Sequence, residues 1–583
     1  MSVAGTRGGP ASLQMSGACA PTRAGATPFI VRLALALLIL GTCGLAASTW
    51  HVYSGTWDEP EHLAAGIELL DRGRYEYDTE HPPVARVLMA LGPYLAGARS
   101  FGTPPPDGVQ EGIDILYSGG HYRLYLTLAR LGTLPFLALL LWATWLWAHR
   151  VSASAGEALL AVLLLAAVPV VLGHAALATL DVAAAATVLL ASYACQSWME
   201  GGRVRDAVLF GLSSGLAVTT KFSALPFLLL GGAVLALARL LRPGQAAVRA
   251  SSTPRERLAG AALVLLMAAL PVLLAYGIRS PASTAPRRFD WALAFLLREQ
   301  GVSHLAGVVL QHLWLPAWVK GFIEGVVAVK AHNDAGHLSF LLGQLRSGGW
   351  WYFYLVALAA KTPLPLLLCG VPGLVLLARD GWRAHDGWRL APPLLFATVL
   401  LFASGFSRIN IGIRHVLVLY PFLALGAAHA AARAWRALRA APARALASGA
   451  EAGLVALLGW QVLSLWTAHP DYLPYFNEAV AHPEQVLVDS DLDWGQDLWR
   501  LEERAKQMRI ARLSLAYRGT ADLARESLPP YTVLPPGRPA TGWVAISELA
   551  RVHDPNGYGW LEAYRPLQLV GKSIRLYYIP PPS

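Results

Sequence analysis

Charged side chains are scarce in this sequence of 583 residues: only 14% are Asp, Glu, Lys or Arg, whereas 55% are hydrophobic. Soluble globular domains carry about 25% charged residues, so the shortage excludes an ordinary soluble protein and predicts a polytopic membrane protein. Cysteine is also rare. The four cysteines are scattered in or near apolar segments, with neither metal-ligand spacing nor a disulfide framework: Cys19, Cys43, Cys195 and Cys369.

Features of two other protein classes are missing as well. A net charge of +10 could indicate a nucleic-acid partner, but the arginines cluster in short segments between apolar runs. That distribution is typical of cytoplasmic loops of membrane proteins, so no nucleic-acid partner is expected. We find no internal repeat of the kind that marks many secondary transporters.

Long apolar runs are what the sequence has in abundance. Runs of about 20 residues can cross a bilayer, and they predict about eleven helical spans. The first is an uncleaved helix, because its run is long and the segment with Arg7, Arg23 and Arg32 lacks a convincing cleavage site. The predicted spans lie near 30–50, 124–148, 156–173, 176–198, 206–220, 222–241, 258–278, 352–378, 388–407, 412–435 and 449–468.

The loops between these spans predict the orientation. Arginine-rich connections fall on one side, which the positive-inside rule makes cytoplasmic. They contain Arg203, Arg205, Arg242, Arg249, Arg255, Arg257, Arg383, Arg389, Arg433, Arg436, Arg439 and Arg444. The N-terminal tail, residues 1–29, would then lie inside. The Ala- and Arg-rich usage favours a bacterial protein of the inner (plasma) membrane.

Two long outer loops, 51–123 and 279–350, are expected to belong to the transmembrane domain, 30–468. Loop 51–123 contains a predicted helix from Glu61 to Leu70 and an apolar stretch, Val84 to Ala96, suited to the membrane interface. Loop 279–350 carries tryptophans suited to a headgroup-level aromatic belt. They are Trp291, Trp314, Trp318, Trp350 and Trp351.

Residues 469–583 are expected to form a small α/β domain outside the membrane, because apolar runs give way there to short strand and helix patterns. The expected elements are a strand at Val486–Val488, a helix from Gln496 to Met508, and strands at Leu513–Tyr517, Trp543–Ile546 and Ile574–Ile579.

An acidic pair, Asp58-Glu59, follows the first span on its outer side. Adjacent carboxylates beside a bilayer are costly unless they face water, a cation or a substrate. Arg408 and Arg414 break the positive-inside trend, because their loop should be outside. Guanidinium groups bind phosphate bidentately, so a lipid phosphate is the natural ligand. Other polar candidates at this face are His62, Glu80, His81, Asp181, Lys221, Lys361, Asn410 and His415.

These residue types suit one reaction in particular. A sugar linked to a lipid phosphate has an acceptable leaving group when cations stabilise the charge that develops as the bond breaks. A carboxylate can take the proton from the acceptor hydroxyl. Direct attack opposite the phosphate predicts inversion at the anomeric carbon.

Several segments resemble the signatures of GT-C type membrane glycosyltransferases, the group that includes protein O-mannosyltransferases and the aminoarabinose transferase acting on lipid A. The first set is Asp58-Glu59, His81-Pro82-Pro83-Val84-Ala85-Arg86 and Thr179-Leu180-Asp181. Segments that resemble a bacterial branch are Lys361-Thr362-Pro363-Leu364-Pro365, Asn410-Ile411-Gly412-Ile413-Arg414-His415 and Asp489-Ser490-Asp491-Leu492-Asp493-Trp494-Gly495-Gln496-Asp497. The similarity covers most of the chain from about residue 30.

The resemblance implies a polyprenyl- or dolichyl-phosphate sugar donor, mannose or a related sugar, with Asp58 as the catalytic base and Glu59 as its companion. The expected substrate-binding residues are His81, Arg86, Asp181, Lys221, Lys361, Arg408, Arg414 and His415. In the protein mannosyltransferases, Gly-Lys usually follows the His-Pro-Pro segment, whereas Ala85-Arg86 stands here. No MIR-type insertion marks loop 279–350, so the acceptor could be a protein, a lipid or a glycan.

Each site residue also has a structural interpretation. Asp58 could cap the helix that begins near Pro60, Arg414 could extend to the headgroups, and Lys361 could neutralise a helix end. His62 and His81 beside Asp58 could bind a divalent metal, but their spacing matches no known zinc site, so no metal or cofactor is expected. The acidic run from Asp489 lacks the glycine and glutamate of a calcium loop.

Two other functions remain open. A transporter or lipid flippase without bond chemistry would use the same charges as a translocation path, and should show polar residues at the membrane midplane. A non-catalytic scaffold would bind a partner through the C-terminal domain.

Overall fold

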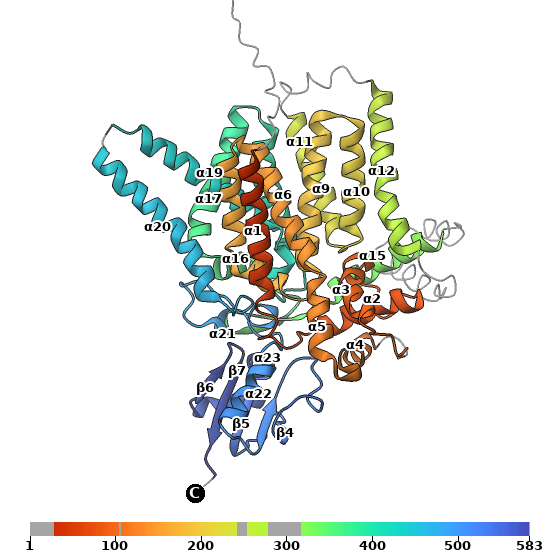
Figure 1. Cartoon of the computed structure of the whole chain (residues 1–583), viewed down its shortest axis with the longest axis vertical. Coiled ribbons are helices and arrows are strands. Elements are labelled where there is room, and N and C mark those ends of the chain that lie inside the picture. The colour runs from red at the N-terminus through yellow and green to blue at the C-terminus, as the bar shows by residue number, and fades with distance from the viewer. Residues whose placement is uncertain (1–27, 104–106, 242–252, 278–315, 443, 582–583) are drawn as a thin grey trace, which may run out of the picture.

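The computed structural model describes residues 28–103, 107–241, 253–277, 316–442 and 444–581. An α-helical body carries a small C-terminal domain with a β-sheet at one end (Figure 1), as the composition predicts. Cys19, Arg7, Arg23, Arg242, Arg249, Trp291, Trp314 and much of loop 279–350 lie outside the described residues, as does the side chain of Arg444.

Seven helices among the described residues are long and apolar enough to cross a membrane, or eight if one bent pair is a single span. The seven are α1 (Phe29–Ala47), α5–α6 (Tyr122–Leu131 and Leu134–Ser152), α9 (Asp181–Gly201), α12 (Pro254–Gly277), α17 (Leu364–Arg383), α18 (Gly387–Phe406) and α20 (Arg444–Ala468). The bent pair is α7 (Ala155–Ala166) and α8 (Pro169–Ala175). Helices also occupy the other predicted spans: α10 (Val204–Val218), α11 (Ala224–Leu240) and α19 (Leu419–Ala440).

Prolines divide two of the predicted spans. The run 156–173 bends by 67° between α7 and α8, where Val168 is extended and Pro169 begins α8. The run 352–378 ends one helix, α16 (Phe353–Lys361), at Thr362, and α17 starts after Pro363. Proline disfavours helical geometry in the preceding residue, which explains both breaks.

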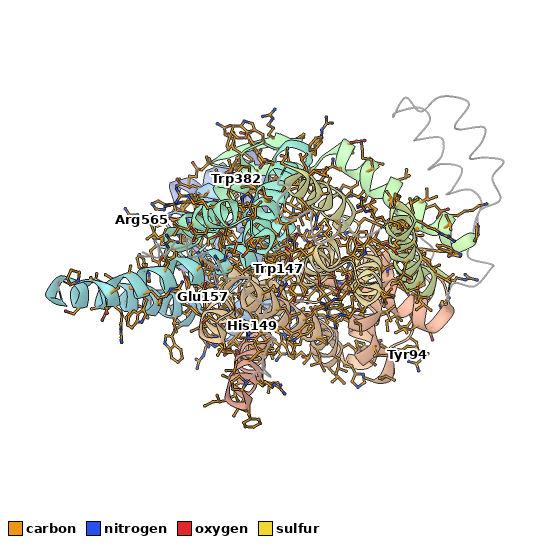
Figure 2. All side chains as sticks on the ribbon, turned by 90° about the horizontal axis from the view of Figure 1, so that it is seen from above. Tyr94, Trp147, His149, Glu157, Trp382 and Arg565 are labelled. Carbon is orange, nitrogen blue, oxygen red and sulfur yellow. The ribbon has the colours of Figure 1, made fainter. Side chains whose placement is uncertain are left out.

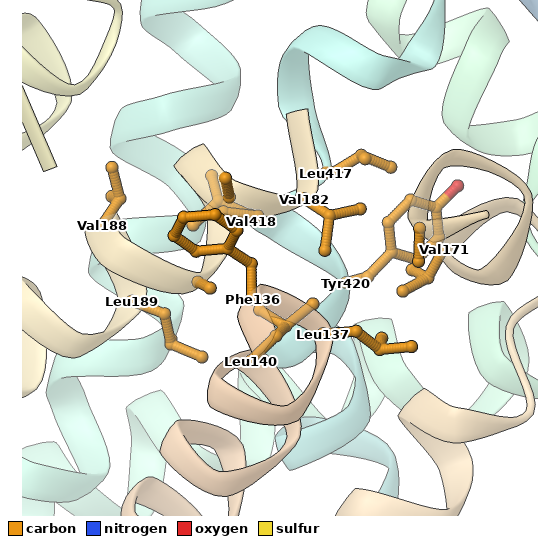
Figure 3. Close-up of a cluster of buried hydrophobic side chains, with 14 of the residues drawn as sticks. Phe136, Leu137, Leu140, Val171, Val182, Val188, Leu189, Leu417, Val418 and Tyr420 are labelled. Atoms are coloured by element: carbon orange, nitrogen blue, oxygen red, sulfur yellow. The ribbon is translucent and has the colours of Figure 1, made fainter. Parts of the chain in front are cut away.

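The predicted start of a span at 412 is wrong. Ile413–Val416 form a short 3₁₀ turn, η4, and α19 begins at Leu419. Leu417 and Val418, which join the two, are buried in the bundle core beside Phe136 of α6 and Val182 of α9 (Figure 3). This packing fixes η4 at the end of the bundle, although the connection itself is not a membrane span.

The loop 51–123 folds into helices α2 (Glu59–Arg72), α3 (Pro83–Leu95) and α4 (Gly108–Tyr117), followed by the turn η1 (Ser118–Gly120). The helix predicted from Glu61 is therefore confirmed. Further along, α15 (Ala317–Ala335) leads into an antiparallel hairpin, β1 (Leu338–Leu341) and β2 (Gln344–Ser347). Of the tryptophans in this region, Trp350 is buried and Trp351 is exposed.

The C-terminal domain contains a five-stranded sheet with the order β4-β3-β5-β7-β6. Strands β4, β3 and β5 are parallel, and β7 and β6 join antiparallel. Helix α22 packs Leu498, Leu501 and Ala505 into the core beside the sheet. The elements are α21 (Pro483–Val486), η5 (Asp489–Asp491), α22 (Leu498–Gln507), β3 (Leu513–Ala516), β4 (Tyr531–Val533), β5 (Gly542–Ser547), α23 (Glu548–His553), α24 (Pro555–Tyr558), η6 (Gly559–Ala563), β6 (Gln568–Val570) and β7 (Ile574–Ile579).

Three of the four strands predicted here are confirmed, and the one at Val486–Val488 is wrong. Val486 ends a helical turn, while Leu487 and Val488 are buried in the protein core without strand pairing. Their apolar character reflects this burial, which a short apolar run cannot distinguish from a strand.

Different groups of elements lie at the two ends of the helical body. Helices α2–α4 and the C-terminal domain gather at the lower end in Figure 1. At the other end, buried His429 lies between Glu157, 3.1 Å away, and Asp380, 3.4 Å away, and joins α19 to α7 and α17. Seen from above, the α19–α20 hairpin extends away from the bundle (Figure 2).

Candidate active site

A cavity of about 1210 Å³ lies at the lower end of the helical body, between the membrane helices, the outer loop helices and the C-terminal domain. Apolar side chains from α11, α15 and α18 line part of it, among them Phe227, Val329, Phe402 and Phe406. Charged and histidine side chains also line the cavity: Asp58, Glu61, His62, Asp78, Glu80, His81, Asp181, Lys221, Lys330, His332, Asp334, His337, Arg408, Arg414, His415, Asp489, Arg518 and His553.

Four predicted site residues form a chain of ion pairs at the cavity. Lys221 Nζ lies 2.6 Å from Asp181 Oδ1, and Arg414 Nη1 lies 3.6 Å from Asp181 Oδ2 and 2.5 Å from Asp58 Oδ2. Asp181 and Arg414 are buried, whereas the Asp58 side chain is 23% exposed. The Asp58 carboxylate is therefore the member of the chain that a substrate in the cavity reaches most easily.

Local sequence explains how this chain is built. Asp181 is the first residue of α9, where a carboxylate is favoured by the helix dipole. Lys221 lies in the turn between α10 and α11, and Arg414 lies in η4 with its guanidinium carbon 4.3 Å from the Trp494 ring centre. The Arg414 Nε atom is buried without a hydrogen-bond partner among the described residues.

Asp58 does not act as a helix cap. It precedes α2, but its side chain accepts no hydrogen bond from the first turn of that helix. The carboxylate contacts Arg414 instead, across a sequence separation of 356 residues. The capping interpretation is thus excluded for this side chain.

Glu59 points away from the cavity, although it adjoins Asp58. Its carboxylate is fully buried, pairs with Arg130 at 2.8 Å, and accepts hydrogen bonds from the amides of Thr56 and Ala178, both 2.8 Å long. Burial alone would raise the pKa of Glu59. Arg130 and these hydrogen bonds together lower the pKa by more than burial raises it, so the net shift is downward. The residue is ionised and fully partnered.

The His-Pro-Pro segment divides between the cavity and the protein interior. His81 lines the cavity, and its Nδ1 lies 2.9 Å from Asp78 Oδ2. Arg86 is completely buried, is absent from the cavity wall, and pairs with the same Asp78 carboxylate. Arg86 also donates to the Tyr75 hydroxyl at 3.0 Å and to the Asp78 carbonyl oxygen at 2.9 Å.

Lys361 is also buried outside the cavity. Its ammonium donates to the carbonyl oxygens of Leu473 at 2.9 Å and Asp491 at 2.5 Å. These bonds attach the end of α16 to the segment that follows α20. Arg408 and His415, by contrast, both line the cavity, and the exposed Arg408 donates to the carbonyl oxygen of Asp334 at 3.2 Å.

The structure adds cavity residues that the sequence did not single out. Glu61 lies one helical turn beyond Asp58, and burial together with the nearby Asp78 carboxylate raises its pKa to about 7. Asp489 comes from the acidic run that resembles a family segment, but the sequence assigned no role to this residue. Arg518 and His553 come from the C-terminal domain, and no sequence signal pointed to them.

The described residues show no metal-binding cluster. They contain no group of three or more His, Cys, Asp or Glu side chains placed to hold a metal ion. Histidines at the site instead face single partners: His332 Nδ1 lies 2.5 Å from Glu80 Oε2, and His81 contacts Asp78.

No protein-family profile and no curated protein matches the chain. Among solved structures, it is similar to ArnT from Cupriavidus metallidurans bound to undecaprenyl phosphate, with 14% identity and a TM-score of 0.45 over 93% of this chain and 97% of ArnT. It is also similar to the Archaeoglobus fulgidus oligosaccharyltransferase, with 15% identity and a TM-score of 0.40 over 74% of this chain and 53% of that one.

The Pmt1–Pmt2 protein O-mannosyltransferase complex of S. cerevisiae, solved with its sugar donor, is a third similar structure. Identity is 16% and the TM-score 0.33, over 44% of this chain and 34% of the yeast chain. All three are GT-C glycosyltransferases, the group that the sequence motifs resemble.

Proposed function

We propose that the protein is a membrane glycosyltransferase that moves a sugar from a polyprenyl-phosphate carrier to an acceptor hydroxyl. The observation that carries this proposal is the position of Asp58 next to Arg414 and Lys221 in a cavity partly lined by apolar side chains. A lipid chain fits the apolar lining, an anionic headgroup fits the cations, and a carboxylate is available for proton transfer.

Lys221 and Arg414 are the proposed phosphate ligands. Both cations reach the cavity, and the unpartnered Arg414 Nε can donate a further hydrogen bond. A phosphate oxygen at Arg414 would compete with Asp58 for the same guanidinium. The donor would then loosen the Asp58–Arg414 ion pair and free the base when it is needed.

Asp58 is the proposed base for a single displacement. The acceptor oxygen attacks the anomeric carbon, its proton passes to an Asp58 carboxylate oxygen, and the bond from the anomeric carbon to the phosphate oxygen breaks. The bonding electron pair stays on the phosphate, where Lys221 and Arg414 stabilise the added charge. Attack opposite the leaving group inverts the anomeric configuration.

We assign the other predicted residues by their contacts. Glu59 and Arg86 are assigned a supporting role for the segment around Asp58, because both are fully buried and paired. Lys361 has the same supporting role for the C-terminal segment. His81, Arg408 and His415 remain proposed substrate contacts, since they line the cavity.

The proposed placement follows from the charge distribution. Residues 1–29 form a cytoplasmic tail, 30–468 a transmembrane domain, and 469–583 a domain outside the inner membrane. The proposed sugar is mannose or a related hexose or pentose, and the acceptor is a protein, lipid or glycan hydroxyl. No metal or other cofactor is part of the proposed mechanism.

The test uses membranes, because they contain the natural acceptor if it is a host component. Membranes from cells producing the wild type, Asp58→Asn or the control Asp522→Asn receive polyprenyl phosphates that carry radiolabelled mannose, glucose or arabinose. Asp522 lies on the surface of the C-terminal domain, paired with Arg525. We expect label in the envelope fraction for the wild type and the control, and a loss of at least about 100-fold for Asp58→Asn.

Equal labelling by wild type and Asp58→Asn would contradict the assignment of the base. Movement of the intact donor across the membrane, without transfer of its sugar, would favour the transporter interpretation.

A further inference from the structure

Asp489 is a carboxylate in the cavity that has no role in the proposed reaction. It belongs to η5, in the segment between the membrane helices and the C-terminal domain, and it lines the same cavity as Asp58. Among the described residues, its carboxylate accepts one hydrogen bond, from the Ser490 amide at 2.7 Å, and has no ion pair within 4.0 Å. The other carboxylates beside Arg414, Asp58 and Asp181, are both paired.

The backbone around Asp489 is held firmly in place from the membrane side. The Ser490 hydroxyl donates to the Ile411 carbonyl oxygen at 2.6 Å, and the Ile413 amide donates to Asp491 Oδ1 at 3.2 Å. Ile411 and Ile413 belong to the connection that carries Arg414. The turn with Asp489 and the proposed phosphate ligand are therefore fixed relative to each other.

The C-terminal domain holds the same turn from the other side. The Leu549 amide of α23 donates to Asp493 Oδ2 at 2.7 Å. Lys361 of α16, in the helical body, donates to the Asp491 carbonyl oxygen. Asp489 itself has a φ of 49°, in the left-handed region that Asn, Asp and Gly tolerate best. Strained backbone and neighbouring anchors together keep one unpaired carboxylate directed at the substrate space.

The surroundings of Asp489 define what it can bind. Arg414, His337 and Asp58 are the charged or titratable groups that act on its carboxyl group, and burial raises its pKa to about 6. The Arg414 guanidinium already forms ion pairs with Asp58 and Asp181. A carboxylate with a free oxygen beside a cationic phosphate site is suited to accept hydrogen bonds from neutral hydroxyl groups.

We propose that Asp489 binds a hydroxyl group of the sugar on the donor lipid and so orients the anomeric carbon toward Asp58. This inference rests on the proposed function. The free Asp489 oxygen accepts the hydrogen bond, no covalent bond changes at this residue, and the phosphate remains with Arg414 and Lys221. Asp489 is thus a sugar-binding residue supplied by the segment that leads into the C-terminal domain.

The test separates sugar from phosphate recognition. The full chain in lipid nanodiscs binds either polyprenyl phosphate or the same lipid bearing mannose, glucose or arabinose. The first variant is Asp489→Gly, because glycine accepts the positive φ without strain. Asp489→Asn retains an acceptor oxygen, and Asp522→Asn is the control for an aspartate outside the cavity.

We expect Asp489→Gly to weaken binding of the glycosylated lipid about tenfold or more, with the affinity for polyprenyl phosphate unchanged. Asp489→Asn should recover part of the loss. Unchanged sugar-lipid affinity in Asp489→Gly, an equal loss for both lipids, or wild-type binding of polyprenyl phosphate but of no glycosylated lipid would each overturn the inference. Absence of polyprenyl phosphate binding to the wild type would instead overturn the proposed function itself.

Discussion

Paired charges are the main feature of the site at the scale of single residues. Lys221 is held by Asp181, and Arg414 by both Asp181 and Asp58. These ion pairs offset part of the cost of burying charged side chains. Under the proposed function, a donor phosphate would meet two cations that are already held in place by these pairs.

Replacing Lys221 tests this account of phosphate binding. Lys221→Gln removes one proposed phosphate ligand but leaves Asp181 in contact with Arg414, so the protein should remain folded. We expect affinity for polyprenyl phosphate to fall about tenfold. The measurement is lipid binding in nanodiscs, with Lys572→Gln as the control, because Lys572 is exposed on the C-terminal domain. Equal affinities in the two variants would contradict the assignment of Lys221.

Sequence reasoning selected candidate residues one by one but could not tell which of their side chains lie together. Asp58, Asp181, Lys221 and Arg414 were each selected, and the structure brings them together. Glu59 was grouped with Asp58, yet adjacent side chains leave the backbone in different directions. Which of two neighbours faces a cavity depends on tertiary packing, here on the Arg130 side chain that binds Glu59.

At the scale of elements, buried arginines hold the outer loop against the membrane helices. Arg130 of α5 pairs with Glu59 at the start of α2 and donates to the carbonyl oxygens of Tyr53 at 2.9 Å and Ser54 at 2.8 Å. Arg86 of α3 has a similar position beside Asp78. Buried residues that do not reach the cavity therefore hold the turn that carries Asp58 in place.

Removal of Arg130 should destabilise the protein strongly. Arg130→Met leaves the buried Glu59 carboxylate without its counter-charge, so we expect a loss of about 3–5 kcal/mol in the free energy of unfolding. Thermal unfolding in detergent, followed by tryptophan fluorescence, measures the change. The exposed Arg74→Met is the matched control. Glu59→Gln combined with Arg130→Met should recover part of the loss, and a single variant as stable as the control would contradict this role.

Element predictions were reliable where a local signal decides the conformation. Alternating apolar residues located β3, β5 and β7, whereas the runs 156–173 and 352–378 were each predicted as one span and are divided at Pro169 and Pro363. The turn η4 and the segment around Leu487 were missed, because their apolar residues serve long-range packing. The positions of Arg518 and His553 at the cavity depend on domain docking, which no local pattern encodes.

At the scale of the whole molecule, the C-terminal domain is joined to the outer loop by a continuous seam. The Ser54 amide donates to the Gln496 carbonyl oxygen at 3.0 Å, and the Trp57 amide donates to that of Trp494 at 3.1 Å. Farther out, the Tyr117 hydroxyl contacts Glu526. The domain thus completes the cavity wall and supports the segment that carries Asp58.

Stability of this seam should depend on pH. Burial and the neighbouring Glu526 carboxyl raise the pKa of Glu502 to about 7. The folded protein therefore keeps a proton that the unfolded chain releases near pH 4.5, so this contribution to stability is full at low pH and is lost as pH rises through about 7. Glu526→Gln removes the repulsion and keeps an acceptor for Tyr117.

The measurement compares melting temperatures at pH 6 and pH 8. We expect the decrease between these values to be smaller in Glu526→Gln than in the wild type, and unchanged in the exposed control Glu562→Gln. An identical decrease in all three proteins would show that Glu526 does not raise the pKa of Glu502.

Release of polyprenyl phosphate by purified protein in lipid is the most direct test of the central claim. Polyprenyl-phosphate mannose and other glycosylated donors are supplied with envelope extract as the acceptor source, and free polyprenyl phosphate is followed over time. The account predicts release by the wild type and at least about 100-fold slower release by a folded Asp58→Asn protein. Release at the same rate by both proteins would contradict the account.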